Sequence, residues 1–199
     1  LDDDSPDGQG EIWDELSKHD EKLSIIHRKE KLGIGSAHKE GIFWAYDRSY
    51  NILITMDSDY SHSPDDIVLF LENSEEFDVI VGTRFARRDG MGDLSIIRQL
   101  LSMTAHFMTK YLLRVPYDCT NGFRLYNLDN IPRSLFQEVK SHSYSFFFES
   151  LFIIHNRNLK IHEVAIKLGG RFYGDSNMAL SDAMLSIRML LKLLKEKYF

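Results

Sequence analysis

Residues 51–66 read NILITMDSDYSHSPDD, and the fold of the chain can be worked out from this stretch. Its apolar run, residues 52–56, is rich in β-branched side chains and too short for a helix, which indicates a buried strand. Asp57 and Asp59 follow this strand, and the alternation of side chains along a strand lets both carboxylates point the same way. Pro64 and the acids after it are typical of the first turn of a helix. This succession of strand, acidic turn and helix predicts a ligand site at the carboxyl end of an α/β sheet.

Two carboxylates at the end of a buried strand are costly unless something positive binds them. Asp57 and Asp59 therefore favour a metal site, because one ion can meet both side chains. A turn with two solvated acids is the alternative, and the stretch alone leaves both interpretations open.

The rest of the chain alternates between helical and extended patterns. Apolar residues at helical spacing predict helices over residues 11–18, 35–46, 64–73, 95–113, 128–139, 144–156 and 179–197. Short apolar or alternating runs predict strands over residues 23–27, 52–56, 78–82, 123–126 and 161–168. Because helix and strand alternate through the first 84 residues, we expect an α/β fold with a mostly parallel sheet flanked by helices.

Composition limits the class of protein further. The 199 residues, 43% of them hydrophobic and 27% charged, suit a single domain over residues 1–199. A net charge of -6 argues against a nucleic-acid partner. The single cysteine, Cys119, excludes an intrachain disulfide and favours a reducing compartment, so we expect a cytoplasmic protein. No run of about 18 apolar residues, the length that indicates a membrane-spanning helix, is present.

Seven short motifs carry a resemblance to a known family. They are D-D-x-S-P-D-G at residues 2–8, K-x-G-x-G at 31–35, M-D-S-D-x-S-H-x-P at 56–64, V-G-T-R-F at 81–85, R-x-x-x-S at 98–102, D-x-T-N-G-F-R at 118–124 and R-x-Y-G-x-S at 171–176. In this order they resemble the dolichol-phosphate mannosyltransferases, family 2 glycosyltransferases with the three-layer GT-A fold. The resemblance extends from residue 2 to about residue 177.

The resemblance implies roles for the acidic motifs. It implies that Asp57 and Asp59 hold Mg²⁺ or Mn²⁺ on the donor's diphosphate, and these hard cations do prefer carboxylate and phosphate oxygens. It implies that Asp3 contacts the nucleotide base, whose N–H groups can donate to a carboxylate. His62, beside the acidic turn, is interpreted as structural rather than as a ligand.

The resemblance also implies phosphate-binding arginines, since guanidinium binds phosphate through paired, charge-assisted hydrogen bonds. Arg171 is assigned to the diphosphate, and Arg84 and Arg98, with Ser102, to the phosphate of the acceptor. Asp59, Arg84 and Arg98 are the predicted catalytic residues. The other predicted substrate-binding residues are Ser58, Asp118, Thr120, Arg124 and Ser176. Glu149 lies in an apolar helix, so we expect a partner for its charge, with an arginine as the candidate.

The implied function is an inverting, metal-dependent transfer of a hexose to a polyprenyl phosphate, with mannose from GDP-mannose as the preferred donor. A UDP-sugar donor and a non-catalytic relative that binds lipid phosphate or a partner are the alternatives. A haloacid-dehalogenase-like phosphatase also begins with strand and D-x-D, but that interpretation leaves the other six motifs unexplained.

Two features depart from the family pattern. Asn177 stands where the family has a lysine. The family's first strand and helix have no counterpart before the acidic motif, so we expect an unpaired sheet edge or an open nucleotide pocket beside Asp3. Residues 179–197 carry an apolar face and a basic face, which favours a helix on a membrane surface. A terminal helix packed on the domain is the alternative.

Overall fold

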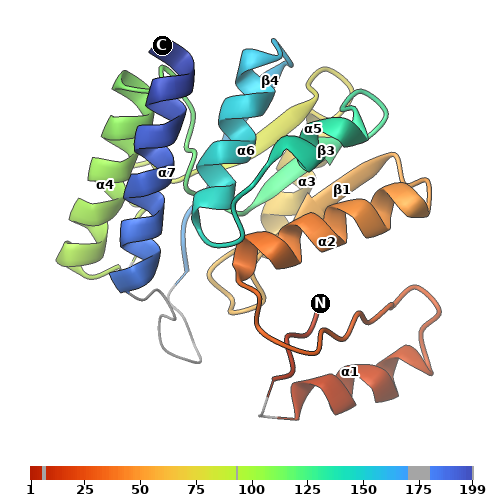
Figure 1. The fold of residues 1–199 in the computed structure, drawn as a ribbon. Helices are drawn as coiled ribbons and strands as arrows, with labels where there is room; N and C mark the ends of the chain where they lie inside the picture. The colour runs from red at the N-terminus through yellow and green to blue at the C-terminus, as the bar shows by residue number, and fades with distance from the viewer. Residues whose placement is uncertain (6–7, 93, 170–179, 199) are drawn as a thin grey trace.

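The computed structural model describes residues 1–5, 8–92, 94–169 and 180–198 (Figure 1). The helices are α1 Gln9–Ser17, α2 Ile34–Asp47, α3 Ile67–Glu72, α4 Ile96–Tyr111, α5 Arg133–Glu138, α6 Ser145–Asn156 and α7 Leu180–Tyr198, with a short 3₁₀ turn, η1 Pro64–Asp66. The strands are β1 Ile52–Thr55, β2 Val79–Thr83, β3 Arg124–Asn127 and β4 Ile161–Ala165. The elements predicted from sequence periodicity are thus largely confirmed, with boundaries shifted by a few residues.

The four strands form one sheet in the order β1-β3-β2-β4. β2 and β4 pair in parallel, whereas β3 pairs antiparallel with both β1 and β2. Three strands therefore run in one direction and β3 runs against them, so the sheet is mixed, although most of its strands are parallel in direction as expected. Within the described residues β1 pairs with β3 alone and forms one edge of the sheet.

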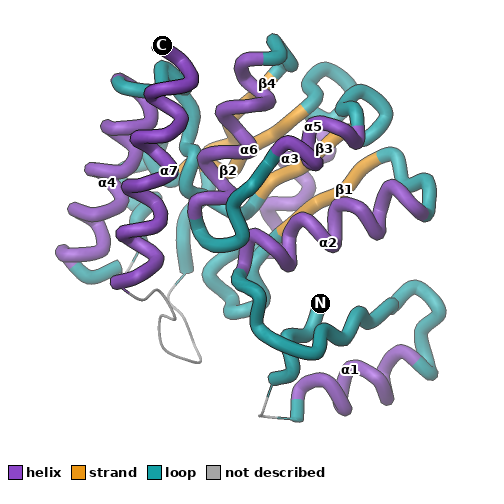
Figure 2. The backbone as a smooth tube through the Cα atoms, viewed as in Figure 1, coloured by secondary structure: helices purple, strands orange, loops and turns teal. Residues whose placement is uncertain are grey.

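Helices cover both faces of this sheet, which gives the expected three layers (Figure 2). On one face Val79 and Val81 pack against α2, α5 and α6. On the other face Ile80 packs with Phe70 of α3 and Leu125 of β3. Neighbouring residues of a strand point to opposite faces, so β2, buried throughout, carries one core on each side.

The expected strand over residues 23–27 is wrong. With the rest of the described chain this segment makes one bridge, between Asp2 and His27, in which Asp2 N–H donates to Ile26 O at 2.9 Å and Arg28 N–H donates to Asp2 O at 2.8 Å. A strand is stabilised by a ladder of cross-strand pairs, and here the partner segment at residues 1–3 is too short to supply one.

Two long helices lie side by side at the left of Figure 1, α4 and the C-terminal α7. Their C-terminal ends are joined, because Lys197 Nζ donates to Leu113 O and Tyr198 Oη donates to Leu112 O at 3.1 Å. Leu190 and Leu193 bury one face of α7 in the core. The packed terminal helix is thus confirmed, while the opposite face of α7 stays exposed.

Candidate active site

The acidic turn lies at the carboxyl end of β1, as predicted. Asp57 and Asp59 are both partly buried, and Asp59 Oδ1 accepts a hydrogen bond from Ser61 N–H at 3.0 Å. Tyr60, directly after Asp59, has a φ of 63°, so the backbone turns sharply there. The turn is tied to the sheet, since Thr55 Oγ1 donates to Gly122 O at 2.8 Å. The two carboxylates thus stand on a fixed backbone.

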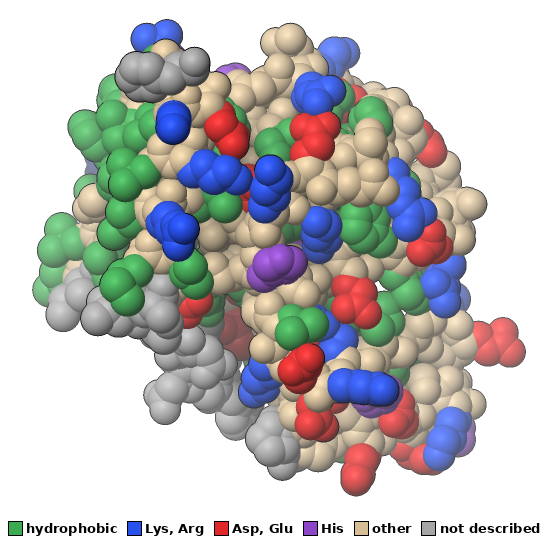
Figure 3. Space-filling view, viewed as in Figure 1, with side chains coloured by type: hydrophobic (Ala, Val, Ile, Leu, Met, Phe, Trp, Pro, Cys, Tyr) green, Lys and Arg blue, Asp and Glu red, His purple; other side chains and the backbone are tan. Residues whose placement is uncertain are grey.

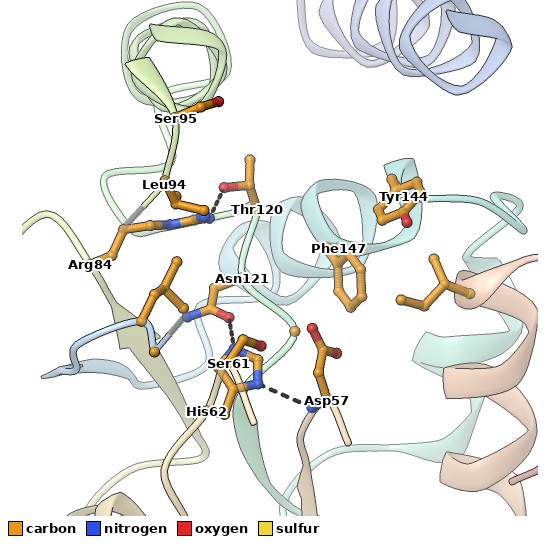
Figure 4. A pocket seen from close by; sticks show the side chains of 14 residues that line it. Asp57, Ser61, His62, Arg84, Leu94, Ser95, Thr120, Asn121, Tyr144 and Phe147 are labelled. Atoms are coloured by element: carbon orange, nitrogen blue, oxygen red, sulfur yellow. Dashed lines mark hydrogen bonds between the residues drawn. The ribbon is translucent and has the colours of Figure 1, made fainter. Parts of the chain in front are cut away.

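His62 joins the acidic turn to the turn at residues 118–124. Its Nδ1 accepts from Asp57 N–H at 3.0 Å, and its Nε2 lies 3.1 Å from Asn121 Oδ1 (Figure 4). Asn121 Nδ2 in turn donates to Gly82 O at 2.6 Å, at the end of β2. Because Nδ1 is an acceptor, the proton sits on Nε2, and burial lowers the pKa of His62 and so favours this neutral form. His62 is therefore a structural residue, as interpreted from the sequence.

Asp118, predicted to bind substrate, is instead fully buried, lines neither of the cavities described below and forms an ion pair with Arg84. Arg84 Nε and Nη2 donate to Asp118 Oδ2 and Oδ1 at 3.0 and 3.3 Å, and Arg84 Nη2 donates to Thr120 Oγ1 at 2.5 Å. Burial raises the pKa of Asp118, but the charge and hydrogen bonds of Arg84, together with Thr120, outweigh this and hold it below its ordinary value. Arg84 lines the cavity described below while its charge is already matched by a carboxylate.

Glu163, on β4, binds the backbone of Asp118 in this pair. Its Oε1 accepts from the backbone N–H of Asp118 at 2.6 Å. Burial raises the pKa of Glu163. No sequence motif singled it out, and only the parallel pairing of β4 with β2 brings it beside Asp118.

Arg124 differs from its predicted role as a substrate-binding residue. It is fully buried, and its guanidinium donates to three backbone carbonyls and to the Ser150 hydroxyl. With its side chain closed off in this way, Arg124 holds the 118–124 turn against α6 and does not reach the cavity. Glu149 also differs: it accepts from the backbone N–H groups of Lys140 and Ser141, not from an arginine.

Two cavities open on either side of the acidic turn. The first, about 320 Å³, contains Asp57, Ser61, His62, Arg84, Thr120 and Asn121 in its lining. The second, about 800 Å³, contains Asp3, Ser5, Trp13, Lys31 and Ser58. Ile34 and Tyr144 line both, so the cavities adjoin. Figure 4 shows Asp57, Tyr144 and Phe147 grouped around the first cavity.

Asp3 lines the larger cavity and is held by a buried arginine. Arg28 Nη1 lies 2.9 Å from Asp3 Oδ1, Arg28 Nε lies 3.1 Å from Glu40 on α2, and Arg28 Nη2 donates to Ser36 at 2.7 Å. Asp3 itself is 25% exposed, whereas the Arg28 side chain is 4% exposed. Sequence reasoning missed Arg28, because it lies in no motif and is placed only by the bridge at residue 27.

The donor set at the acidic turn suits a metal ion that also binds substrate. Within the described residues no three His, Cys, Asp or Glu side chains converge in a way that could hold a metal ion. Mg²⁺ and Mn²⁺ are hard cations, and Mg²⁺ is commonly held by one or two carboxylates plus substrate phosphates. Asp57 and Asp59 fit this mode of binding, in which the protein supplies only part of the coordination.

Three predicted residues are not placed by this geometry. Arg171 and Ser176 lie outside the described residues, and so does the side chain of Arg98. Ser102, on α4, has a buried hydroxyl without a hydrogen-bond partner among the described residues, and it lines neither cavity.

Comparison with known proteins identifies the family. The family model described as glycosyl transferase family 2 matches residues 1–132. The chain belongs to this family. It is 31% identical over 185 residues to polyprenol monophosphomannose synthase of Mycolicibacterium smegmatis, covering 92% of this chain and 70% of that protein. It is 29% identical over 180 residues to undecaprenyl-phosphate mannosyltransferase of Micrococcus luteus, covering 90% of this chain and 74% of that protein.

A solved structure supports the GT-A fold. Glucosyl-3-phosphoglycerate synthase from Mycobacterium tuberculosis, solved in complex with uridine diphosphate, superposes with a TM-score of 0.59. The match covers 98% of this chain and 66% of that one at 17% sequence identity, so it bears on the fold alone.

Proposed function

We propose that this chain is a single catalytic domain that transfers a hexose from a nucleotide sugar to a polyprenyl phosphate. Mannose from GDP-mannose is the proposed donor, because the two relatives above are named as mannose-transferring enzymes of polyprenol and undecaprenyl phosphate. The observation that carries the proposal is the position of the acidic turn between two adjoining cavities, where Asp57 lines the smaller cavity and Ser58 lines the larger one. Such an arrangement suits a reaction in which two substrates meet at one diphosphate.

The donor nucleotide is assigned to the larger cavity. Asp3 accepts hydrogen bonds from the base, and Arg28 fixes the Asp3 carboxylate by its ion pair at 2.9 Å. Ser58 lines the same cavity beside the acidic turn. Asp57 and Asp59 would hold Mg²⁺ or Mn²⁺, which would neutralise the charge of the departing diphosphate. Arg171 and Ser176 are proposed as further donor contacts from their motif.

The acceptor phosphate is assigned to the smaller cavity, beside Arg84 and Thr120. In the proposed step, a phosphate oxygen of the acceptor attacks the anomeric carbon as the bond from that carbon to the diphosphate breaks. The diphosphate leaves with the bonding electron pair, and the configuration inverts. Because the second pKa of a phosphate monoester is about 6, the attacking oxygen is ionised at neutral pH and needs no dedicated base.

Arg84 can assist this step despite its ion pair. Asp118 fixes the orientation of the guanidinium, and the bonds to Asp118 and Thr120 use Nε and Nη2, not Nη1. A preorganised donor of this kind stabilises the charge that builds up between two phosphates. Arg98 and Ser102 are kept as acceptor contacts on the strength of their motif.

We propose further that the exposed face of α4 and α7 meets the membrane that carries the acceptor. α4 exposes Ile96, Leu100, Met103, Phe107 and Tyr111, and α7 exposes Met184, Ile187 and Leu191. Both sets recur at helical spacing, so each helix turns an apolar stripe to the outside, and an exposed patch of this extent is typical of an interaction site. Hydrophobic side chains gather over α4 and α7 at the left of Figure 3.

These helices would lie on a bilayer rather than cross it. Among the described helices none combines the length and the apolar character that spanning a membrane requires. We propose a peripheral enzyme on the cytoplasmic side of a membrane, since the single cysteine of the chain fits a reducing compartment.

The test is transfer of labelled sugar to a short polyprenyl phosphate in the presence of Mn²⁺. We expect product from GDP-mannose and little or none from UDP-glucose. Product from UDP-glucose alone would reverse the donor assignment. Absence of transfer from any common sugar nucleotide, with nucleotide binding intact, would favour a non-catalytic binding protein.

A further inference from the structure

A basic groove lies beside the larger cavity, between α7 and the segment that leads into α6. Its volume is about 760 Å³. We define it by its charged and histidine side chains, which are Lys31, Lys140, His142, Asp182, Arg188 and Lys192. It shares Lys31 and Asp182 with the larger cavity, but Lys140, Arg188 and Lys192 line neither cavity of the active site.

The concentration of positive charge in this groove is unusual for the protein. The chain carries a net charge of -6, yet the groove brings together four cations and one carboxylate. Lysine and arginine side chains gather over this region in Figure 3. They come from three segments of the sequence, so neighbouring residues of a single helix do not account for the cluster.

Most of these cations have no ion-pair partner among the described residues. Lys31, Lys140 and Arg188 make no ion pair with any residue in the described ranges, and Lys192 lies 3.7 Å from Glu196 on its own helix. Like charges gathered in a concave surface raise the local potential and attract anions. The N-terminus of α6, where Ser145 lines the groove, adds the positive end of a helix dipole.

We propose that the basic groove binds a phosphate group, at a site separate from the donor and acceptor phosphates. An arginine fork and flexible lysines together suit a phosphate, which offers several acceptor oxygens. The phosphate belongs either to a small phosphorylated molecule or to a lipid headgroup. Both sources share the same chemistry, and Leu185, half exposed at the rim, joins the groove to the apolar face of α7. This proposal does not depend on the transfer reaction.

The test is an amide NMR titration of the intact chain with inorganic phosphate at low ionic strength. We expect saturable shifts in residues 140–145 and 185–192. The double variant Arg188→Ala/Lys192→Ala should raise the dissociation constant obtained from these shifts about tenfold or more, as expected when a charge-assisted hydrogen bond is lost. Lys140→Ala, on a different segment, should also raise this dissociation constant. Lys195→Ala is the matched control, since Lys195 is exposed on the same helix but does not line the groove.

Vesicles separate the two sources of phosphate. Binding to phosphatidylcholine vesicles with and without phosphatidylglycerol is measured for the same variants. If the double variant binds more weakly than wild type to vesicles with phosphatidylglycerol but equally to vesicles without it, the ligand is a headgroup. If vesicle binding is unchanged while the inorganic phosphate shifts are lost, the ligand is a small phosphorylated molecule. If neither probe distinguishes the double variant from Lys195→Ala, the groove is not a phosphate site and the proposal fails.

Discussion

The buried pair between Asp118 and Arg84 allows the sharpest prediction about stability. Asp118 is fully buried and accepts hydrogen bonds from Arg84 Nε and Nη2 and from the Thr120 backbone N–H and hydroxyl, at 2.9–3.3 Å. Asp118→Asn keeps the shape but removes the charge, which leaves Arg84, 12% exposed, without its counter-ion. Breaking such a pair costs about 3–5 kcal/mol of the free energy of unfolding.

The assay is urea denaturation of wild type and Asp118→Asn at pH 7, where the midpoint should fall with an unchanged slope. Asp89→Asn is the matched control, because it breaks an arginine–aspartate pair of similar length on the surface and should leave the midpoint unchanged. A loss below about 1 kcal/mol, the range of a surface pair, would refute the reasoning.

The same variant has a defined pH dependence. The pKa of Asp118 is held below its ordinary value of 3.8, chiefly by Arg84 acting against the burial penalty. Its contribution to stability is therefore complete above that value and is lost as the pH falls through the lower pKa of the folded state. The stability difference between wild type and Asp118→Asn should be constant near neutrality and shrink below about pH 4. A difference that grows on acidification would contradict the assignment.

Three further predictions concern activity, membrane binding and pH. Arg98→Ala should lower transfer by about 2 kcal/mol or more while nucleotide binding changes little, with Lys110→Ala on the same helix as control. Phe107→Asp/Leu191→Asp should weaken co-sedimentation with vesicles at least tenfold, because each buried side chain contributes about 1.5–3 kcal/mol, whereas substitution of the equally exposed Ile12 on α1 should have no effect. Burial raises the pKa of Glu163 above its ordinary value of 4.5, so wild type loses stability as the pH rises above 4.5 and this carboxyl ionises. Glu163→Gln lacks this loss and should therefore gain stability relative to wild type, as measured by thermal melts from pH 4 to 8.

The elements of the fold were largely predictable, because each follows from a local pattern. The run at residues 52–56 and the apolar helix α6 are examples, and both occur where expected, although β1 is a partly buried edge strand and not the buried strand that was predicted. The direction of β3 was not predictable. The direction depends on where β3 enters the sheet, between β1 and β2. A run of four residues carries no signal for that position.

Site prediction placed the turn that carries Asp57 and Asp59 correctly at the carboxyl end of β1, where motif and strand pattern coincide, while the metal role of these acids stays a prediction. It failed for Arg124, because an arginine that donates to carbonyls within the core and one that binds phosphate look alike in sequence. It missed Arg28 and Glu163, since each acts on a residue far away in the chain and gains its role only through tertiary contact. The helix at α4 was predicted without a packed face, because periodicity shows that a helix has two faces without showing which one packs.

The central claim is that the acidic turn binds the donor diphosphate together with a divalent ion. Calorimetric titration with GDP, with and without Mn²⁺, tests this most directly. We predict that Mn²⁺ strengthens binding to wild type and that Asp59→Ala abolishes this gain, whereas Asp65→Ala, an exposed acid of η1 outside the D-x-D motif, retains it. Equal binding of GDP before and after treatment with EDTA, or an undiminished Mn²⁺ effect in Asp59→Ala, would contradict the account.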